Sequence, residues 1–178
     1  KNKLISAEVS PHHLYFCDDD IVDFNTNLKV APPVRSKSDR KKLIEGIKNG
    51  TIDCIATDHA PHGYEDKMTT LNQAAFGISN FETTLGSVLE LFHSKQIKLE
   101  KLLKCLTINP AEFLGKKLGK LSKGYPADIV IIDLEKEWKV EISDFVSLGK
   151  NSPLQGTKFK GKVVQTLVCL LYTSPSPR

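Results

Sequence analysis

The sequence predicts an α/β fold, with part of an α/β barrel followed by a small β module. Three observations predict it. A short apolar run at 52–57 is typical of a buried parallel strand. Segments on both sides of this run repeat apolar residues at helical spacing. From Gly119 onward the chain contains only candidate strands and turns, which indicates a separate β module.

The first elements of the predicted barrel are a strand and a capped helix. Residues 4–9 predict the strand, and the Asp-, Asn- and Pro-rich stretch 10–38 predicts a loop. A capping box at 36–39 begins the helix, and Gly50 ends it. The apolar face of this helix holds Leu43, Ile44 and Ile47.

The next elements surround the apolar run. The strand at 52–57 ends at Asp58, and a long loop covers 59–78. A second capping box, SNFE at 79–82, begins another helix. The apolar face of that helix holds Phe81, Leu85, Val88, Leu89 and Phe92.

Two further helices complete the barrel portion. One is marked by Leu99, Leu102, Leu103 and Leu106. The other starts with Asn109 as its N-cap and Pro110 at its first helical position, and Gly115 ends it. In a barrel, catalytic residues lie where strands end and loops begin, and Asp58 occupies such a position.

The β module is predicted from short apolar and β-branched runs. A turn at 125–128 leads into a strand at 129–132, and 138–140 and 158–168 predict further strands. We therefore divide the chain into a barrel portion at 1–116, a β module at 117–168 and a tail at 169–178. The tail is rich in Ser and Pro, and we expect it to be a disordered end or foreign sequence outside the fold.

The start of the chain predicts that residues precede it. The first residue is Lys1 rather than methionine, and it leads at once into the strand at 4–9. We therefore expect the N-terminus to be a truncation point.

Composition and charge exclude several classes of protein. Hydrophobic residues make up 40% and charged residues 26% of the chain, which is typical of a globular domain. The net charge of +4 is scattered rather than clustered, so we expect no nucleic-acid partner. We find no signal peptide and no stretch apolar enough to span a membrane. Four widely spaced cysteines indicate reduced thiols and a cytoplasmic protein.

The run TDHAPH at 57–62 carries the most distinctive chemistry. A carboxylate at a buried strand end, next to two imidazoles, can bind a divalent metal or act as a base on metal-bound water. Such a carboxylate can accept a proton during attack and return it to a leaving nitrogen. The alternative interpretation is structural, with Asp58 capping the loop and both histidines lying on the surface.

Several blocks of sequence, taken together, resemble class I dihydroorotases of the amidohydrolase superfamily over about 4–168. They are AEVSPHHL at 7–14, PPVRS at 32–36, DR at 39–40, GTIDCIATDHAPH at 50–62, AFGI at 75–78 and TINPA at 107–111. They occur in the family's order and at about its spacing. The resemblance implies the C-terminal part of a (β/α)8 TIM-type barrel, followed by a small β module of a composite β domain.

The resemblance also implies roles for four residues. Asp58 would be the last metal ligand of the barrel and the general acid/base of ring opening and closing. His62 would hydrogen-bond the substrate, and Phe76 and Gly77 would line the substrate pocket with backbone groups on the pyrimidine ring. The alternative for Phe76 is a plain core aromatic, and Gly77 can instead serve backbone geometry alone.

Four other positions matter for this resemblance. His12 and His13 are expected in an extended segment where adjacent side chains point apart, which favours a structural role over a shared metal. Glu8 lies at a strand end and is a weaker metal candidate. Where bacterial members of the family often carry a substrate-binding asparagine, this chain has Ala31, which puts its substrate specificity in doubt.

The resemblance implies a zinc-dependent cyclic amidohydrolase with one or two zinc ions per site. It would interconvert dihydroorotate and N-carbamoyl-aspartate in de novo pyrimidine (UMP) biosynthesis. Its partners would be this small-molecule substrate and, in addition, a second copy in a homodimer or aspartate carbamoyltransferase. The family's other metal ligands and its substrate-binding arginine are absent from this sequence, so we expect the chain as given to be inactive.

Two alternatives stay open. A hydantoinase, dihydropyrimidinase or allantoinase would share Asp58 but usually lacks the second histidine of the motif, so His62 discriminates between them. A non-catalytic, dihydroorotase-like structural partner of aspartate carbamoyltransferase is the other alternative. The β module would leave strand edges unpaired, and we expect low solubility of the isolated chain.

Overall fold

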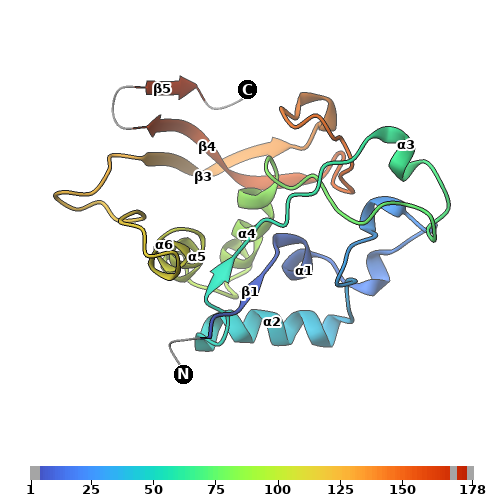
Figure 1. The fold of residues 1–178 in the computed structure, drawn as a ribbon, viewed down its shortest axis with the longest axis horizontal. Coiled ribbons are helices and arrows are strands. Elements are labelled where there is room, and N and C mark those ends of the chain that lie inside the picture. Colours follow the sequence, from blue (N-terminus) through green and yellow to red (C-terminus); the bar gives the residue numbers. More distant parts are fainter. Residues whose placement is uncertain (1–4, 169–171, 176–178) are drawn as a thin grey trace.

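A computed structural model describes the backbone of residues 5–168 and 172–175 and the side chains of 5–168 (Figure 1). The helices and strands are β1 (Glu8–Val9), α1 (Pro11–Tyr15), α2 (Lys37–Asn49), β2 (Cys54–Ile55), α3 (Tyr64–Lys67), α4 (Thr84–His93), α5 (Leu99–Leu106), α6 (Ile108–Phe113), β3 (Ile129–Lys139), β4 (Lys158–Val168) and β5 (Tyr172–Pro175). Short 3₁₀ turns occupy Asp18–Asp20, Thr26–Leu28 and Ile142–Asp144.

The two strands of the barrel portion pair in parallel. Glu8 lies opposite Cys54 and Val9 opposite Ile55, so β1 and β2 are shorter than predicted but occupy the expected runs. Because parallel strands end at the same edge, the residues after Val9 and those after Ile55 emerge side by side. This edge brings α1 close to Asp58.

Helix α2 confirms the prediction from its local signals. Ser36 Oγ accepts a hydrogen bond from the backbone N–H of Asp39, and Gly50 ends the helix in the left-handed conformation. Ile44 and Ile47 are buried and Leu43 packs against the same core. Each end of α2 is fixed by hydrogen bonds between residues that are close in sequence, which explains why the sequence predicted both ends of the helix.

The start of α4 corrects a prediction. Residues 79–82 do not form a capping box, because α4 begins at Thr84 and no side chain caps it. The Ser79 hydroxyl donates instead to the Gly149 carbonyl, and Glu82 accepts from the Ser147 backbone. Phe81, predicted on the apolar helix face, lies before the helix and is exposed.

Helices α5 and α6 follow the predicted order with one shifted boundary. Helix α5 covers the leucine-rich run as expected, whereas α6 begins at Ile108 rather than after Asn109. The Asn109 side chain donates to the Asp53 carbonyl at 2.7 Å, so it ties α6 to β2 instead of capping the helix. Gly115 follows the end of α6, as predicted.

The β module is an antiparallel sheet in the order β3-β4-β5. Strand β3 is one strand with register shifts rather than the two predicted at 129–132 and 138–140. Strand β4 has the predicted bounds. The tail was expected to lie outside the fold, but Tyr172–Pro175 pairs with β4 as β5. Residues 169–171 and 176–178 of that tail fall outside the described residues.

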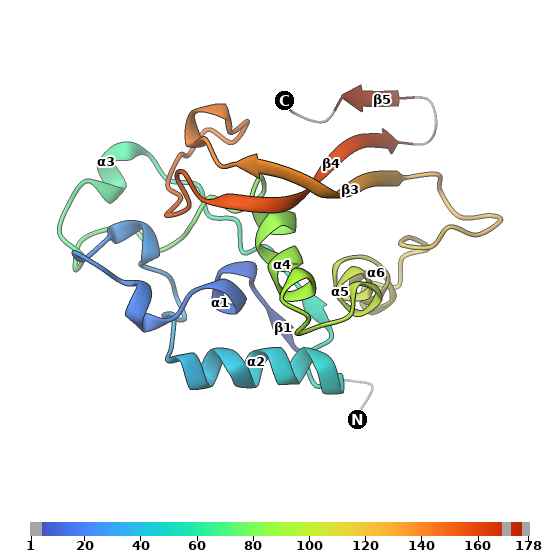
Figure 2. The same cartoon turned by 180° about the vertical axis from the view of Figure 1, so that it is seen from behind.

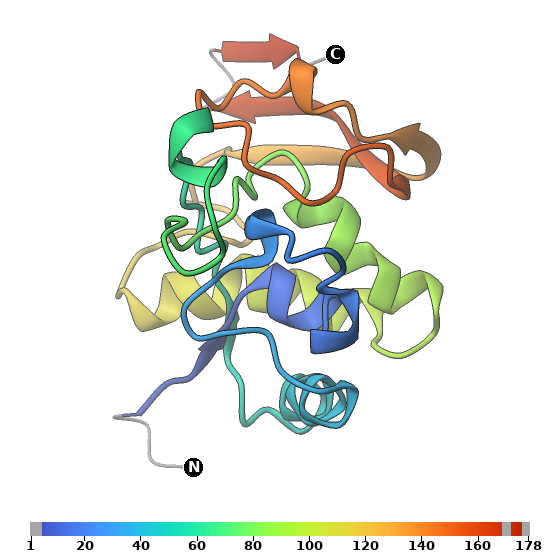
Figure 3. The ribbon, with the colours of Figure 1, turned by 90° about the vertical axis from the view of Figure 1, so that its right-hand side faces the viewer.

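The sheet and the helices form layers around a shared interior (Figures 2 and 3). The β3-β4-β5 sheet lies on one side, α2 on the opposite side, and α4 between them. One apolar cluster joins β1, β2, α1, α2, α4 and α5; a second holds Val140, Phe145, Leu154 and Phe159 and receives Tyr15 and Phe16. Each fully buried aliphatic or aromatic side chain contributes about 1.5–3 kcal/mol to the stability of the fold.

None of the helices in the described part of the chain has the length and apolar character needed to span a bilayer.

Candidate active site

Asp58 follows β2, but β2 ends at Ile55 rather than at residue 57, where the sequence predicted the strand to end. Its backbone adopts the left-handed conformation with φ of 47°, which asparagine and aspartate tolerate better than other side-chain-bearing residues. The side chain is about half exposed, at 53%. The carboxylate is therefore accessible at the edge where β1 and β2 end, and the nearby imidazole of His12 lies 3.6 Å from it.

His12 corrects the expectation of an extended segment, because it lies on the short helix α1 and is 2% exposed. Its Nδ1 is 2.8 Å from the side-chain nitrogen of Asn80. Burial, together with the neighbouring His13, lowers the pKa of His12 to about 3. The imidazole is therefore neutral at pH 7, and its Nε2 is the atom that faces Asp58 at 3.6 Å.

Among the described residues, His13 and Glu8 are not part of a cluster that could hold a metal. His13 Nε2 lies 2.9 Å from the Pro32 carbonyl, to which it donates, and Ser10 Oγ lies 2.5 Å from its Nδ1. Both ring nitrogens of His13 are thus used, one by Ser10 just before α1 and the other by Pro32 in the loop after it. Glu8 is exposed on β1. Within 5–168, no group of three or more His, Cys, Asp or Glu side chains could hold a metal ion.

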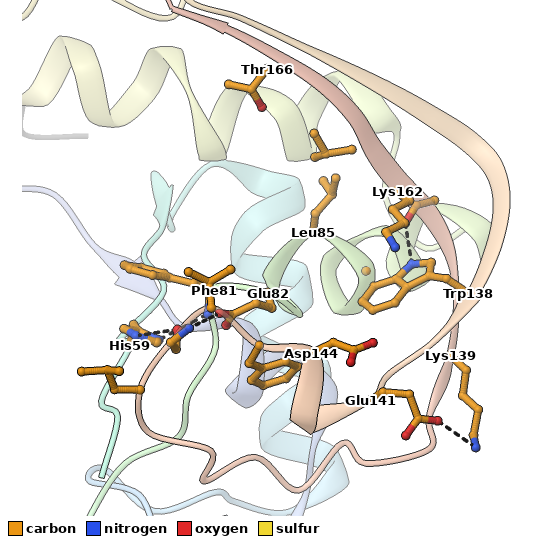
Figure 4. Close-up of a pocket in the computed structure, with 17 residues that line it drawn as sticks. His59, Phe81, Glu82, Leu85, Trp138, Lys139, Glu141, Asp144, Lys162 and Thr166 are labelled. Atoms are coloured by element: carbon orange, nitrogen blue, oxygen red, sulfur yellow. Dashed lines mark hydrogen bonds and ion pairs between the residues drawn. The ribbon is translucent and has the colours of Figure 1, made fainter. Parts of the chain in front are cut away.

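His59, the first histidine of the motif, anchors the segment before α4. Its Nδ1 accepts from the backbone N–H groups of Asn80 and Phe81 at 3.0 and 3.3 Å. Its ring stacks on Phe81 with centroids 3.8 Å apart, and its Nε2 lies 3.4 Å from Ser147 Oγ (Figure 4). His59 is partly buried and structural rather than a free surface residue.

His62, the second histidine, ties the motif to the loop that holds Phe76. Its Nε2 donates to the Phe76 carbonyl at 2.8 Å, and its backbone N–H donates to the Asn151 side chain at 2.8 Å. Its Nδ1 lies 3.8 Å from an Asp66 oxygen, beyond hydrogen-bonding distance. Of the two ring nitrogens of His62, Nε2 is therefore the one that is hydrogen-bonded among the described residues.

Phe76 and Gly77 lie beside His62, and their role in lining a substrate pocket stays a prediction. Phe76 is not a core aromatic, because it is 55% exposed and the Lys29 ammonium lies 4.3 Å above its ring. Gly77 has φ of 135°, and a Cβ atom there would meet Ala60 Cβ at 2.3 Å. Backbone geometry and close packing therefore both require glycine at this position.

Asn151 is a buried residue of the site that the sequence did not reveal. Its side-chain nitrogen donates to the carbonyls of Ala60 and Gly77 at 2.9 and 3.1 Å, and its oxygen accepts from His62. The β-module loop thus holds the motif and the Phe76–Gly77 loop together. Because Asn151 lies 89 residues from His62, no local pattern in the sequence could have indicated this contact.

Asn151→Ala is expected to lower the free energy of unfolding by about 2–4 kcal/mol, because three backbone groups lose their buried partner. Urea denaturation of the purified chain measures the change. Asn49→Ala is the control, since Asn49 is exposed and makes one local hydrogen bond, to Thr51. Equal effects of the two substitutions, each of about 0.5 kcal/mol or less, would contradict the role of Asn151.

Lys67 is a buried cation behind the Phe76 loop. It is 6% exposed, and its Nζ donates to the carbonyls of Thr26 and Ala75 at 3.1 and 2.7 Å. Burial, with a smaller contribution from Lys29, lowers the pKa of Lys67 to about 8. Lys67 thus joins the loop at Thr26 to the segment just before Phe76.

This pKa predicts a pH dependence of stability. Between pH 8 and about 10.5 the unfolded chain binds more protons at Lys67 than the folded chain, so stability rises with pH in that window. The expected gain is on the order of 2 kcal/mol between pH 8 and 10. Urea denaturation at several pH values measures it, with Lys67→Met as the control that removes this rise. A rise of equal size in Lys67→Met would contradict the assignment.

A cavity of about 700 Å³ lies next to the motif, between α4, β3, β4 and the loop after Asp144 (Figure 4). His59, Phe81, Glu82 and Trp138 are among its lining residues. None of the four predicted site residues lines it. The candidate site is therefore the open strand-end edge around Asp58 rather than this apolar cavity.

Asp58 fits the role of a single zinc ligand, because it presents an accessible carboxylate at a strand end. A catalytic zinc takes about three protein ligands, and the described residues bring together no such set. The expectation that the chain as given is inactive stays a prediction.

Comparisons with known proteins place the chain in a family. A model of the amidohydrolase family matches residues 8–168. Dihydroorotase from Ehrlichia canis (strain Jake) is 46% identical over 164 residues, which are 92% of this chain and 37% of that protein. Dihydroorotase from Geobacillus sp. (strain WCH70) is 49% identical over 165 residues, 92% of this chain and 39% of that protein. The chain thus spans less than two fifths of the length of these relatives.

A solved structure shows the same fold. L-Hydantoinase (Dihydropyrimidinase) from Arthrobacter aurescens aligns with a TM-score of 0.90 and 33% identity, over 97% of this chain and 39% of that one. The mixed helix-and-strand architecture is that of amidohydrolases, and the predicted barrel portion agrees with it. The chain belongs to the amidohydrolase family, and within that family its sequence is dihydroorotase-like.

Proposed function

We propose that the whole protein is a zinc-dependent cyclic amidohydrolase that interconverts dihydroorotate and N-carbamoyl-aspartate in pyrimidine biosynthesis. The observation that carries this proposal is the accessible Asp58 carboxylate just after β2, in the same short motif as His62, which is bonded to the Phe76 carbonyl. Its support is the identity of 46–49% to dihydroorotases over 92% of the chain. The other zinc ligands come, in this proposal, from outside the described residues.

In this proposal Asp58 is a metal ligand and the group that moves a proton. Zinc, when bound, supplies a Lewis acid and an activated water at neutral pH. Water adds across the ring amide C–N bond, and its oxygen becomes part of the new carboxylate. Asp58 accepts the proton from this water and returns it to the leaving ring nitrogen. The reverse sequence closes the ring.

Substrate recognition in this proposal falls to the loops held by Asn151. His62 offers its Nδ1, since its Nε2 is bonded to the Phe76 carbonyl. The Gly77 N–H donates to the Lys29 carbonyl, and the Gly77 carbonyl accepts from Asn151. A hydrogen bond from either group to the substrate ring would therefore have to be made in addition to these bonds. Ala31 is exposed and brings no side-chain hydrogen bond to the substrate.

A hydantoinase-type activity is the second candidate, because the hydantoinase from Arthrobacter aurescens shares the fold with a TM-score of 0.90. The presence of His62 favours dihydroorotate over hydantoin. A non-catalytic partner of aspartate carbamoyltransferase is the third candidate, and retention of both Asp58 and His62 argues against it. Homodimer formation and association with that transferase both belong to the proposal.

The test is a substrate comparison with the purified whole protein. Dihydroorotate, dihydrouracil and hydantoin are supplied at equal concentration, and ring opening is followed for each. We expect kcat/KM for dihydroorotate to exceed the other two by about a hundredfold or more, a difference of about 3 kcal/mol. Faster opening of hydantoin would support the second candidate, and no opening of any substrate would support the third.

A further inference from the structure

The imidazole of His12 holds a buried polar atom that lacks a partner. Its Nε2 has no hydrogen-bond partner among the described residues and almost no exposed surface. Buried donors without partners are rare in folded proteins and cost about 1–3 kcal/mol. The Nε2 atom lies 3.6 Å from Asp58 Oδ2, just beyond a hydrogen bond. The packing of the fold alone does not explain why a buried Nε2 atom without a partner lies next to the Asp58 carboxylate.

Asn80 decides which nitrogen of His12 carries the proton. Its side-chain nitrogen lies 3.0 Å from the Thr57 carbonyl, which can only accept, so this atom of Asn80 must be the NH₂ group. The same NH₂ group lies 2.8 Å from His12 Nδ1, which must therefore accept. A neutral imidazole that accepts at Nδ1 carries its hydrogen on Nε2. Asn80, itself 3% exposed, thus presents an Nε2–H group to Asp58.

We propose that His12 is a positioning residue for Asp58, and that its Nε2–H hydrogen-bonds the Asp58 carboxylate in the assembled site. The proposal rests on the proposed function, in which Asp58 binds zinc and moves the proton. A small rotation of the half-exposed Asp58 side chain closes the 3.6 Å gap to a hydrogen bond. Hydrogen bonds in active sites are often long without substrate and tighten in the complex.

Such a bond would give the two oxygens of Asp58 different roles. A neutral donor on one oxygen fixes the side-chain rotamer without neutralising the carboxylate. The other oxygen is then the one that takes the proton in ring opening. Hydrogen bonds to ligating carboxylates orient them, and their loss typically lowers metal affinity or activity about 10–100-fold.

A matched pair of substitutions in the whole protein tests the proposal. His12→Asn keeps an acceptor near the place of Nδ1, for Asn80, but has no group at the place of Nε2. His12→Gln can extend its amide N–H toward the place of Nε2. We expect kcat to fall about 10–100-fold in His12→Asn with KM within about twofold, and His12→Gln to recover most of kcat. Equal kcat values in the two variants would overturn the proposal.

A second readout depends neither on activity nor on the folding of the His12 variants. Nitrogen-15 NMR of histidine-labelled whole protein reports which nitrogen of His12 carries hydrogen. We expect hydrogen on Nε2, and a change of the Nε2 shift in Asp58→Ala while Nδ1 still accepts. Hydrogen on Nδ1, or an Nε2 shift unmoved by Asp58→Ala, would overturn the proposal. Failure of the proposed function would appear separately, as wild-type protein without dihydroorotate turnover.

Discussion

Asp58→Asn is expected to lower kcat for dihydroorotate by about a thousandfold or more in the whole protein. Asparagine has nearly the same shape as aspartate, but it cannot accept the proton of the attacking water and it is a poorer zinc ligand. Steady-state kinetics on the zinc-loaded protein measure the effect. A kcat within about tenfold of wild type would contradict the assigned role, because general acid–base catalysis alone is worth about 10²–10⁴.

The same substitution should leave the fold intact, so a loss of kcat in Asp58→Asn would report on chemistry rather than on unfolding. Asparagine is accepted in the left-handed backbone region that residue 58 occupies, with φ of 47°. The side chain is about half exposed and lies 3.6 Å from the neutral imidazole of His12, so little packing depends on it. We expect the free energy of unfolding to change by about 0.5 kcal/mol or less. A larger loss would assign Asp58 a structural role as a loop cap.

Gly77→Ala is expected to lower the free energy of unfolding by about 3 kcal/mol or more. The new methyl group would lie 2.3 Å from Ala60 Cβ and 3.0 Å from the Ala60 carbonyl oxygen. The backbone at Gly77, with φ of 135°, is also strained for any residue with a side chain. Relief of the clash would move residues 60–62 away from Phe76, so substrate binding should weaken as well. Urea denaturation and KM for dihydroorotate measure the two effects.

Gly115→Ala is the matched control. Gly115 has φ of 64°, but a Cβ atom there would meet nothing within 4 Å. This substitution therefore carries the cost of the left-handed backbone alone, about 1–2 kcal/mol. A loss in Gly77→Ala no larger than that in Gly115→Ala would show that the close approach to Ala60 is not important.

Local signals in the sequence predicted local structure well. The ends of α2 follow from Ser36 and Gly50, whose hydrogen bonds join residues close in sequence. The SNFE run at 79–82 carries the same kind of signal but starts no helix. Ser79 and Glu82 bond instead to Gly149 and Ser147, far along the chain. A capping pattern predicts a helix start only where no distant partner competes for the same side chains.

The candidate site was predictable only in part, for the same reason. Asp58 could be found because it ends an apolar run that forms a strand. The supporting contacts could not, because Asn80 meets His12 across 68 residues and Asn151 meets His62 across 89. His12 itself was assigned to an extended segment, since the five-residue helix α1 has little helical periodicity to detect.

The most direct test of the account is metal removal from the purified whole protein. Zinc is stripped with a chelator and then restored, and formation of N-carbamoyl-aspartate from dihydroorotate is measured in wild type and in Asp58→Asn. We predict that wild-type activity is lost on stripping and returns with zinc, and that the Asp58→Asn protein gains no comparable activity. Full turnover of dihydroorotate by the stripped wild-type protein, or by zinc-loaded Asp58→Asn, would contradict a zinc-dependent reaction centred on Asp58.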